Sequence, residues 1–240
     1  MIWSVARMMG IGKGDINLIL VSYGYILALI LISGRLEGVL GLSRGSARKF
    51  LHVMIGNLVL VIPFFRWPPA SVIIAAPFIL VTVLASPYSP IPRLRALLGG
   101  LVDLTEEGHH LGLILYSVSF TLLVVLFQMR PDVVVAGILP MAYGDSSAAL
   151  VGRRLGKRET LNGKTVEGSA AMFTVSLISL ILGLAFISTV HSFDLIQSLV
   201  PAVTVAIVCT LVEALSPRGL DNLAVPVLGA LTFYLASGGL

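Results

Sequence analysis

Long apolar runs, separated by short clusters of charged residues, proline and glycine, make up most of the chain. A helix needs about 20 apolar residues to cross a hydrocarbon core of about 30 Å, and most of the runs approach that length. The runs do not alternate between polar and apolar positions as the strands of a membrane β-barrel do. The pattern therefore predicts an all-α, polytopic integral membrane helical bundle with about eight transmembrane helices, over residues 16–33, 51–65, 69–86, 111–128, 131–151, 169–190, 193–215 and 219–238.

The composition narrows the class of protein. Hydrophobic residues make up 57% of the 240 residues and charged residues only 12%, whereas an ordinary soluble domain carries about 25% charged residues. This balance excludes the soluble globular and the disordered classes. The spans leave little chain for an extramembrane domain, so we expect one membrane-embedded domain over residues 1–240. The single cysteine, Cys209, excludes an internal disulfide and a cysteine-rich metal site.

Positive charge is unevenly divided between the two sides of the predicted bundle. Twelve Lys and Arg residues fall on the side of the loops that follow odd-numbered spans, and four fall on the other side. Because cytoplasmic loops carry the excess of Lys and Arg, we expect the odd-numbered loops in the cytoplasm and both chain ends outside. The twelve are Arg35, Arg44, Arg48, Lys49, Arg93, Arg95, Arg153, Arg154, Lys157, Arg158, Lys164 and Arg218, and the four are Arg7, Lys13, Arg66 and Arg130.

The unusual polar residues gather on the same predicted side, in the segments 48–52, 103–110, 152–168 and 213–222. This arrangement fits an enzyme that takes a soluble substrate from the cytoplasm and a lipid from the bilayer. A transporter would instead place ionisable groups near the middle of the membrane. We therefore expect a small soluble ligand and a lipid as partners, and no nucleic acid.

Asp145 is the most informative single residue, because it lies in an otherwise apolar helix shortly before a basic loop. Burying an unpaired carboxylate there costs several kcal/mol, so it needs a cation, a metal or a hydrogen-bond donor. Two interpretations stay open: Asp145 binds a metal ion, or it forms a structural ion pair with Arg153 or Arg154. Gly144 directly before it permits a close approach of another backbone.

The loop 152–168 carries five basic and two acidic residues, and glycines stand at positions 152, 156, 163 and 168. Its basic side chains can neutralise a polyphosphate, and the glycines permit tight turns. Lys164 and Thr165 lead into the sixth predicted span, whose first backbone N–H groups would point at an anion. A bare basic loop would more simply contact anionic lipid headgroups, but its ordered glycines beside Asp145 favour nucleotide binding.

The segment from Asp145 to Gly168 has the pattern D-x-x-A-x-x-x-G-x-x-x-G, seven residues, then K-T-x-E-G. It resembles the CTP-binding signature of the dolichol kinase and phytol kinase family, integral membrane enzymes that phosphorylate polyprenyl alcohols with CTP. The likeness extends to Arg48-Lys49-x-x-His52, to Glu213 and to the segment 219–226, and so covers residues 44 to about 235. In size the chain resembles the compact phytol kinase type rather than the longer eukaryotic dolichol kinases.

The resemblance, together with the charges, implies a set of site residues. Magnesium would bridge the nucleotide phosphates to carboxylates, with Asp145 as the first choice of ligand. The catalytic candidates are Asp145, Lys164, Glu167 and Glu213. The expected nucleotide-binding residues are Arg48, Lys49, His52, Gly152, Arg153, Arg154, Gly156, Lys157, Lys164, Thr165, Gly168, Ser169, Asp221 and Asn222.

Other clusters have alternative interpretations. Arg48 and His52 share a helix face that can grip a phosphate, or the basic residues reach toward lipid headgroups. The segment 106–110 resembles a metal-ligand cluster but reads better as a polar helix start, with Glu107 near the site. Glu213 either joins the site or pairs with Arg218.

The predicted activity is CTP-dependent phosphorylation of a membrane polyprenyl alcohol, such as phytol, geranylgeraniol or a dolichol-like lipid. The main alternative is a CTP-dependent lipid cytidylyltransferase, whose products are a CDP-lipid and pyrophosphate. A CTP-dependent diacylglycerol kinase is a further alternative, and a transporter is the non-enzyme alternative. The chain length of the lipid, the choice among CTP, UTP and ATP, and the oligomeric state are left open by the sequence.

Overall fold

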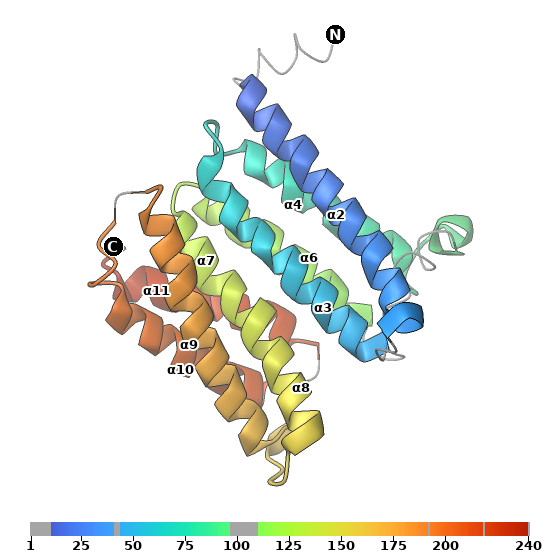
Figure 1. Ribbon diagram of the computed structural model, residues 1–240, viewed down its shortest axis with the longest axis vertical. Helices are drawn as coiled ribbons and strands as arrows, with labels where there is room; N and C mark the ends of the chain where they lie inside the picture. Colours follow the sequence, from blue (N-terminus) through green and yellow to red (C-terminus); the bar gives the residue numbers. More distant parts are fainter. Residues whose placement is uncertain (1–10, 41–43, 97–109, 192, 218, 240) are drawn as a thin grey trace.

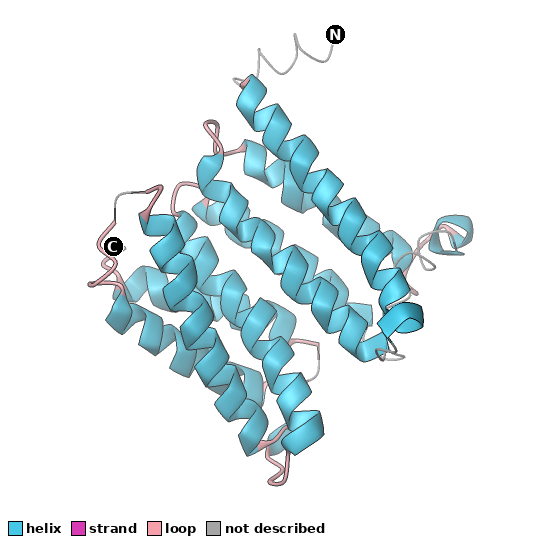
Figure 2. Ribbon diagram, viewed as in Figure 1, coloured by secondary structure: helices cyan, strands magenta, loops and turns pink. Residues whose placement is uncertain are grey.

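The computed structural model describes residues 11–40, 44–96, 110–191, 193–217 and 219–239. Every regular element in these ranges is a helix and none is a strand, although one isolated bridge joins Glu159 and Thr165 (Figure 2). The all-α prediction is therefore confirmed for the described part of the chain.

The helices follow one another in the order shown in Figure 1. They are α2 (Lys13–Leu40), α3 (Arg44–Gly56), the 3-10 helix η1 (Asn57–Phe64), α4 (Ala70–Ala85), α6 (His110–Phe127), α7 (Pro131–Leu139), the π-helix η2 (Pro140–Asp145), α8 (Ser146–Leu155), the short 3-10 turn η3 (Leu161–Gly163), α9 (Val166–Ser188), α10 (Leu199–Leu215) and α11 (Asp221–Ala236).

Each of the eight predicted spans overlaps a helix or a continuous run of helices. Three stretches among the described residues are long and apolar enough to cross a membrane: Lys13–Ile32, Pro131–Leu155 and Val166–Ser188. The other apolar helices are shorter, at 10–17 residues. The chain is thus a helical membrane protein, and the count of eight transmembrane helices stays a prediction.

The run α7–η2–α8 lies in the middle of the bundle, whereas α2 lies along one edge and α9 and α10 lie on the opposite side (Figure 1). Of the 18 most apolar consecutive residues within Pro131–Leu155, 78% are buried. The corresponding share within Lys13–Ile32 is 22%. A helix buried this far must meet its neighbours closely, and α7 contains small and β-branched residues that allow such packing.

Two local features explain how this central run begins and changes geometry. Pro131 is the first residue of α7, where its missing N–H costs nothing because no helical partner would exist. Pro140 stands at the start of η2, so it cannot donate to the preceding turn, and the helix widens over Pro140–Asp145. The widened turn ends at Asp145, the residue that the sequence singles out.

Gly144 makes this widened turn possible next to α9. A Cβ atom at position 144 would lie 2.1 Å from the Ser176 Oγ and 2.7 Å from the Met172 Sδ. A side chain there would force Ser176 and Met172 to shift, so glycine lets the η2 backbone pack directly on α9. The expected close approach at Gly144 is confirmed.

On the opposite end of the molecule, Asp15 joins α2 to the turn between η1 and α4. Its carboxylate is buried and accepts hydrogen bonds from the backbone N–H of Gly12 (3.0 Å) and of Arg66 (2.8 Å). Further along, the Tyr23 hydroxyl donates to the Ile73 carbonyl (2.5 Å). The two contacts fix the direction of α4: it starts at the Asp15 end and runs parallel to α2.

Candidate active site

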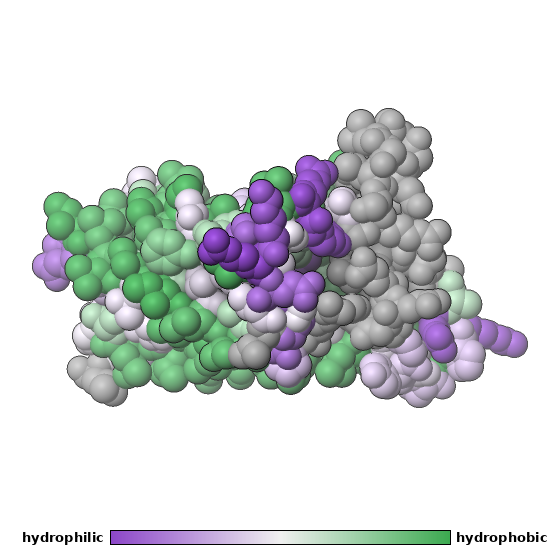
Figure 3. All heavy atoms as spheres, turned by 90° about the horizontal axis from the view of Figure 1, so that it is seen from below, coloured by the Kyte–Doolittle hydropathy of each residue, from purple (hydrophilic) through white to green (hydrophobic). Residues whose placement is uncertain are grey.

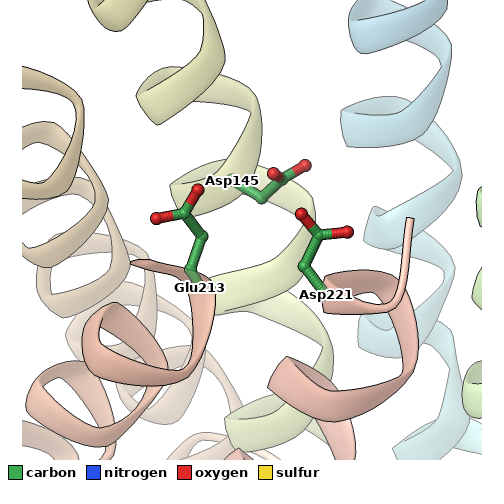
Figure 4. Close-up of side chains that lie close together, drawn as sticks. All are labelled: Asp145, Glu213 and Asp221. Carbon is green, nitrogen blue, oxygen red and sulfur yellow. The ribbon is translucent and has the colours of Figure 1, made fainter. Parts of the chain in front are cut away.

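Three buried carboxylates converge at one end of the bundle (Figure 4). Asp145 ends η2, Glu213 lies in the last turn of α10, and Asp221 is the first residue of α11. Each offers an oxygen atom, and these atoms lie within 4.8 Å of one another. Three negative charges this close repel one another unless cations balance them.

Two lysines supply part of that balance. The Lys49 ammonium, from α3, forms an ion pair and hydrogen bond with the Asp145 carboxylate. The Lys164 ammonium contacts Glu213 Oε1 at 2.6 Å and Asp221 Oδ2 at 3.1 Å, and donates to the Glu213 carbonyl oxygen at 2.5 Å. Three carboxylates and two ammonium groups together carry a formal charge of about −1.

Burial opposes the charged form of Lys164, but the neighbouring carboxylates of Asp221 and Glu213 outweigh it and hold the Lys164 pKa above its usual value. Lys164 therefore stays an ammonium ion at neutral pH. One interpretation of the sequence was an ion pair of Asp145 with Arg153 or Arg154. In the structure, Lys49 forms the ion pair with Asp145 instead. The other alternative partner of Glu213, Arg218, lies outside the described residues.

The turn between α10 and α11 holds Asp221 in place. Its second carboxylate oxygen accepts hydrogen bonds from the backbone N–H of Gly219 (3.1 Å) and Asn222 (3.0 Å). Gly219 adopts φ +91°, a left-handed conformation that favours glycine. The Asn222 amide donates to the Gly112 carbonyl (2.9 Å), and this bond ties the turn to the start of α6.

The basic loop between α8 and α9 folds back on itself. Thr160 N–H donates to the Lys164 carbonyl (2.7 Å), and Val166 N–H donates to the Arg158 carbonyl (3.0 Å). Asn162, at φ 60°, forms the tip and its amide donates to the Leu215 carbonyl (3.1 Å) at the end of α10. The loop is thereby fastened beside the carboxylates, and Lys164 can reach them.

The glycines of the recognised pattern bring α8 and α9 together. A Cβ atom at Gly168 would lie 3.0 Å from the Ala148 carbonyl oxygen and 3.5 Å from the Gly152 Cα. A Cβ atom at Gly156 would lie 2.3 Å from the Gly152 carbonyl oxygen. Thr165 caps α9, where its hydroxyl accepts a hydrogen bond from Gly168 N–H (3.1 Å). These residues have a packing role whatever ligand binds beside them.

A cavity of about 660 Å³ opens at the carboxylates. Most of the predicted site residues line it, namely Lys49, His52, Asp145, Gly152, Arg153, Gly156, Lys157, Lys164, Thr165, Gly168, Ser169, Glu213, Asp221 and Asn222. Seen from the loop end, hydrophilic side chains gather near the middle of the face, beside a broad hydrophobic surface (Figure 3). Residues from five separate parts of the chain thus meet around one volume.

Some predicted residues lie elsewhere. Arg154 is exposed and is not among the lining residues. The Glu167 carboxylate accepts hydrogen bonds from the backbone N–H of Lys157 (3.1 Å) and Arg158 (3.4 Å), so it anchors the loop. Arg48 belongs to α3, but its side chain lies outside the described part, as do Glu107 and the rest of 97–109.

Sequence reasoning missed the other half of the cavity, which lies between α3, α4 and α6. Tyr116 connects it to the predicted site residue His52: the Tyr116 hydroxyl donates to the His52 carbonyl (3.1 Å), and the two rings lie 4.1 Å apart. Beyond it the lining is mainly apolar, with Leu58, Ile74, Ala75, Phe78 and Phe120. No local signal distinguishes these residues from any other position of an apolar membrane helix.

A comparison with curated proteins decides the family. Over 218 residues the chain is 34% identical to the phytol kinase of Synechocystis sp., and the match covers 88% of each chain. The chain belongs to the phytol kinase family. The sequence resemblance to the dolichol and phytol kinases is confirmed by this relationship, which extends over nearly the whole chain. No family model matches the chain, and no solved structure matches it.

Proposed function

We propose that this protein transfers the γ-phosphoryl group of CTP to the hydroxyl of a prenyl alcohol such as phytol or geranylgeraniol. The relationship to a phytol kinase supports the reaction class. The observation that carries the proposal is the two-ended cavity, because a single volume joins a charged cluster to an apolar compartment. A kinase for a lipid alcohol needs both ends, one for phosphates and one for the tail.

The carboxylate cluster fits a divalent cation. Magnesium prefers carboxylate oxygens, and it usually takes only one or two of them together with substrate phosphates. Asp145, Glu213 and Asp221 offer such oxygens within 4.8 Å of one another, and all three are buried. When bound there, magnesium would neutralise charge on the nucleotide phosphates.

The basic residues around the cluster supply the remaining positive charge. Lys49 and Lys164 lie directly at the carboxylates, and Arg153 and Lys157 line the cavity beside them. Phosphoryl transfer depends on such charge neutralisation and on in-line positioning more than on covalent help. We assign the phosphates to these four side chains, with Ser169 as a neighbouring hydroxyl donor. Glu167 has no catalytic role in this proposal, because it anchors the loop backbone.

In the proposed reaction, the alcohol oxygen forms a bond to the γ-phosphorus and the bond from that phosphorus to the β-phosphate oxygen breaks. The products are the lipid monophosphate and CDP. The hydroxyl proton passes to a carboxylate of the cluster, since these buried carboxylates line the charged end of the cavity. The apolar tail stays among the helices throughout.

The test of this function uses the purified protein in liposomes with geranylgeraniol and CTP labelled at either the α- or the γ-phosphate. We expect label from γ-labelled CTP in the lipid, and label from α-labelled CTP in CDP. A cytidylyltransferase would place the α-label in the lipid, and a transporter would turn over no CTP. Parallel reactions with ATP and UTP, and with diacylglycerol, test the choice of nucleotide and of acceptor.

We further propose that the carboxylate end faces the cytoplasm, where the nucleotide is. The excess of Lys and Arg on that side supports this orientation. In a Cys209→Ala background, Thr160→Cys on the loop and Gln197→Cys before α10 place single thiols at exposed positions. An impermeant maleimide should label Thr160→Cys only after the cells are opened, and Gln197→Cys in intact cells. Labelling of both from one side would contradict the orientation.

A further inference from the structure

The apolar half of the cavity has a definite direction. α3 leaves the carboxylates at Lys49 and passes Ile55 on its way to Leu58 in η1. α6 starts beside Asn222, because Gly112 accepts the hydrogen bond from its amide, and it passes Tyr116 before Phe120. Both helices therefore line the cavity with progressively more apolar side chains as they leave the charged end.

α4 lines the same space from the opposite direction. The Thr82 and Ser117 hydroxyls are 2.9 Å apart. Thr82 therefore lies at the same height along the bundle as Ser117, the residue that follows Tyr116 in α6. Ile74 precedes Thr82 by two helical turns, about 12 Å, and lies on the side of the Asp15 end. Ile74 and Ala75 therefore stand at the far end of the cavity, with Phe78 between them and Thr82.

Among the described residues, one pair of hydroxyls, Thr82 and Ser117, lies in this half. The Thr82 hydroxyl contacts the Ile79 carbonyl (3.1 Å) and the Ser117 hydroxyl contacts the Ile114 carbonyl (2.8 Å), in addition to each other. The two hydroxyl hydrogens are shared among these carbonyls and the Thr82–Ser117 contact, so the pair has no free donor and can only accept a hydrogen bond. The charged end, with its carboxylates and ammonium groups, offers an alcohol hydroxyl both donors and acceptors, and the apolar half suits its tail.

We propose that the apolar half, defined by Leu58, Ile74, Ala75, Phe78 and Phe120 and called here the tail arm, holds the isoprenoid tail of the acceptor alcohol. The volume at Ile74 and Ala75 sets the longest tail that fits. The inference rests on the proposed kinase function for its hydroxyl end. The occupant is an isoprenoid alcohol because the tail arm is continuous with the carboxylate cluster, so a tail of this kind delivers its hydroxyl to the charged residues.

Two matched pairs of variants test the tail arm. Ala75 lines the cavity and its neighbour Ala76 does not, so Ala75→Phe fills the far end and Ala76→Phe is the control. Ala75→Phe should lower kcat/KM for the C20 alcohol geranylgeraniol at least about tenfold, while geraniol, with ten carbons, changes much less. Ile74→Ala should raise the preference for the longer alcohol, and Ile73→Ala, at an exposed neighbouring side chain, should leave it unchanged.

Equal effects of Ala75→Phe and Ala76→Phe on both alcohols, with Ile74→Ala unchanged from wild type, would overturn the tail arm while leaving the kinase intact. A second readout needs no turnover. A geranylgeraniol analogue with a diazirine at the tail end should, without nucleotide, cross-link to residues 74–82 or 113–120, and excess geranylgeraniol should suppress it.

Each outcome of the cross-linking separates the two proposals. Cross-links in the tail arm without phosphorylation by any nucleotide would support the arm and contradict the kinase. Cross-links confined to the outer face of α9, or suppressed by phosphatidylglycerol and not by geranylgeraniol, would overturn the arm and assign the space to a membrane lipid.

Discussion

The central run α7–η2–α8 and the peripheral helix α2 are both long, apolar and interrupted by glycine, yet they differ in what their polar residues do. The central run is mostly buried and its carboxylate, Asp145, meets a lysine and two other carboxylates. Few of residues 13–32 of α2 are buried, and within the described part of the chain its buried carboxylate, Asp15, accepts hydrogen bonds from the backbone N–H groups of Gly12 and Arg66. A backbone-bonded carboxylate holds a turn together, whereas a carboxylate among other charges leaves a site for a cation.

The largest expected difference in turnover is between variants of the two buried carboxylates, Asp145 and Asp15. Asp145→Asn keeps the shape of the side chain but removes a charge that a cation needs, so turnover should fall roughly 100-fold or more at every lipid concentration. Asp15→Asn should leave turnover intact and cost about 1 kcal/mol of stability, because one backbone N–H loses its acceptor. Initial rates and thermal unfolding of both variants measure the contrast.

Asp145→Asn also leaves the Lys49 ammonium without its partner, so the variant needs a check of its fold. The double variant Lys49→Met/Asp145→Asn removes the stranded charge, and it should unfold closer to the wild-type temperature while staying inactive. Near-normal turnover in a folded Asp145→Asn protein would place Asp145 with Asp15 among the structural carboxylates.

The two lysines at positions 164 and 13 give the second comparison. Lys164→Met removes a half-buried ammonium from the site, and lost charge-assisted bonds of about 1.5–3 kcal/mol correspond to roughly a 10- to 150-fold rise in the KM for CTP. Lys13→Met, at the exposed start of α2, should change neither KM nor kcat. Steady-state kinetics with varied CTP measure both. Unchanged CTP dependence in Lys164→Met would return the loop to the role of contacting lipid headgroups.

Gly144 in η2 and Gly24 in α2 allow a comparison of how tightly the central run and α2 are packed. Gly144→Ala would place a Cβ 2.1 Å from the Ser176 Oγ, and the resulting shift between η2 and α9 should cost about 1–3 kcal/mol. Gly24→Ala in α2 meets nothing within 4 Å and should be neutral or stabilising by up to about 1 kcal/mol. Thermal unfolding in one detergent compares them. Equal melting temperatures for Gly144→Ala and Gly24→Ala would show that the packing of the central run can adjust to an added methyl group as easily as that of α2.

The apolar runs of the sequence predicted the helices well, because helix formation in a membrane depends on local hydrophobic length. The recognised pattern around Asp145 and Lys164 also located much of the charged end of the cavity. The lengths were less predictable: α4, α10 and α11 are shorter than a typical span, since helix ends depend on turns such as that at Gly219.

Partnerships between distant residues were beyond the sequence. One of the two interpretations of Asp145 was an ion pair with Arg153 or Arg154, but the residue that pairs with it is Lys49, 96 positions away. Glu167 stands in the recognised pattern beside the catalytic candidates, but the fold turns it onto the loop backbone. Proximity along the chain does not determine which charges meet once helices pack side by side.

The sequence by itself determined that this is an apolar helical protein of a lipid-alcohol kinase type, with one charged end built around Asp145 and a basic loop. Only the tertiary structure decided that Asp145, Glu213 and Asp221 share one cluster, and that Tyr116, Phe78 and Ile74 extend the same cavity into the bundle. The reason is physical: hydrophobicity and charge are properties of single residues and short runs, whereas a cavity is the space left by the packing of several helices.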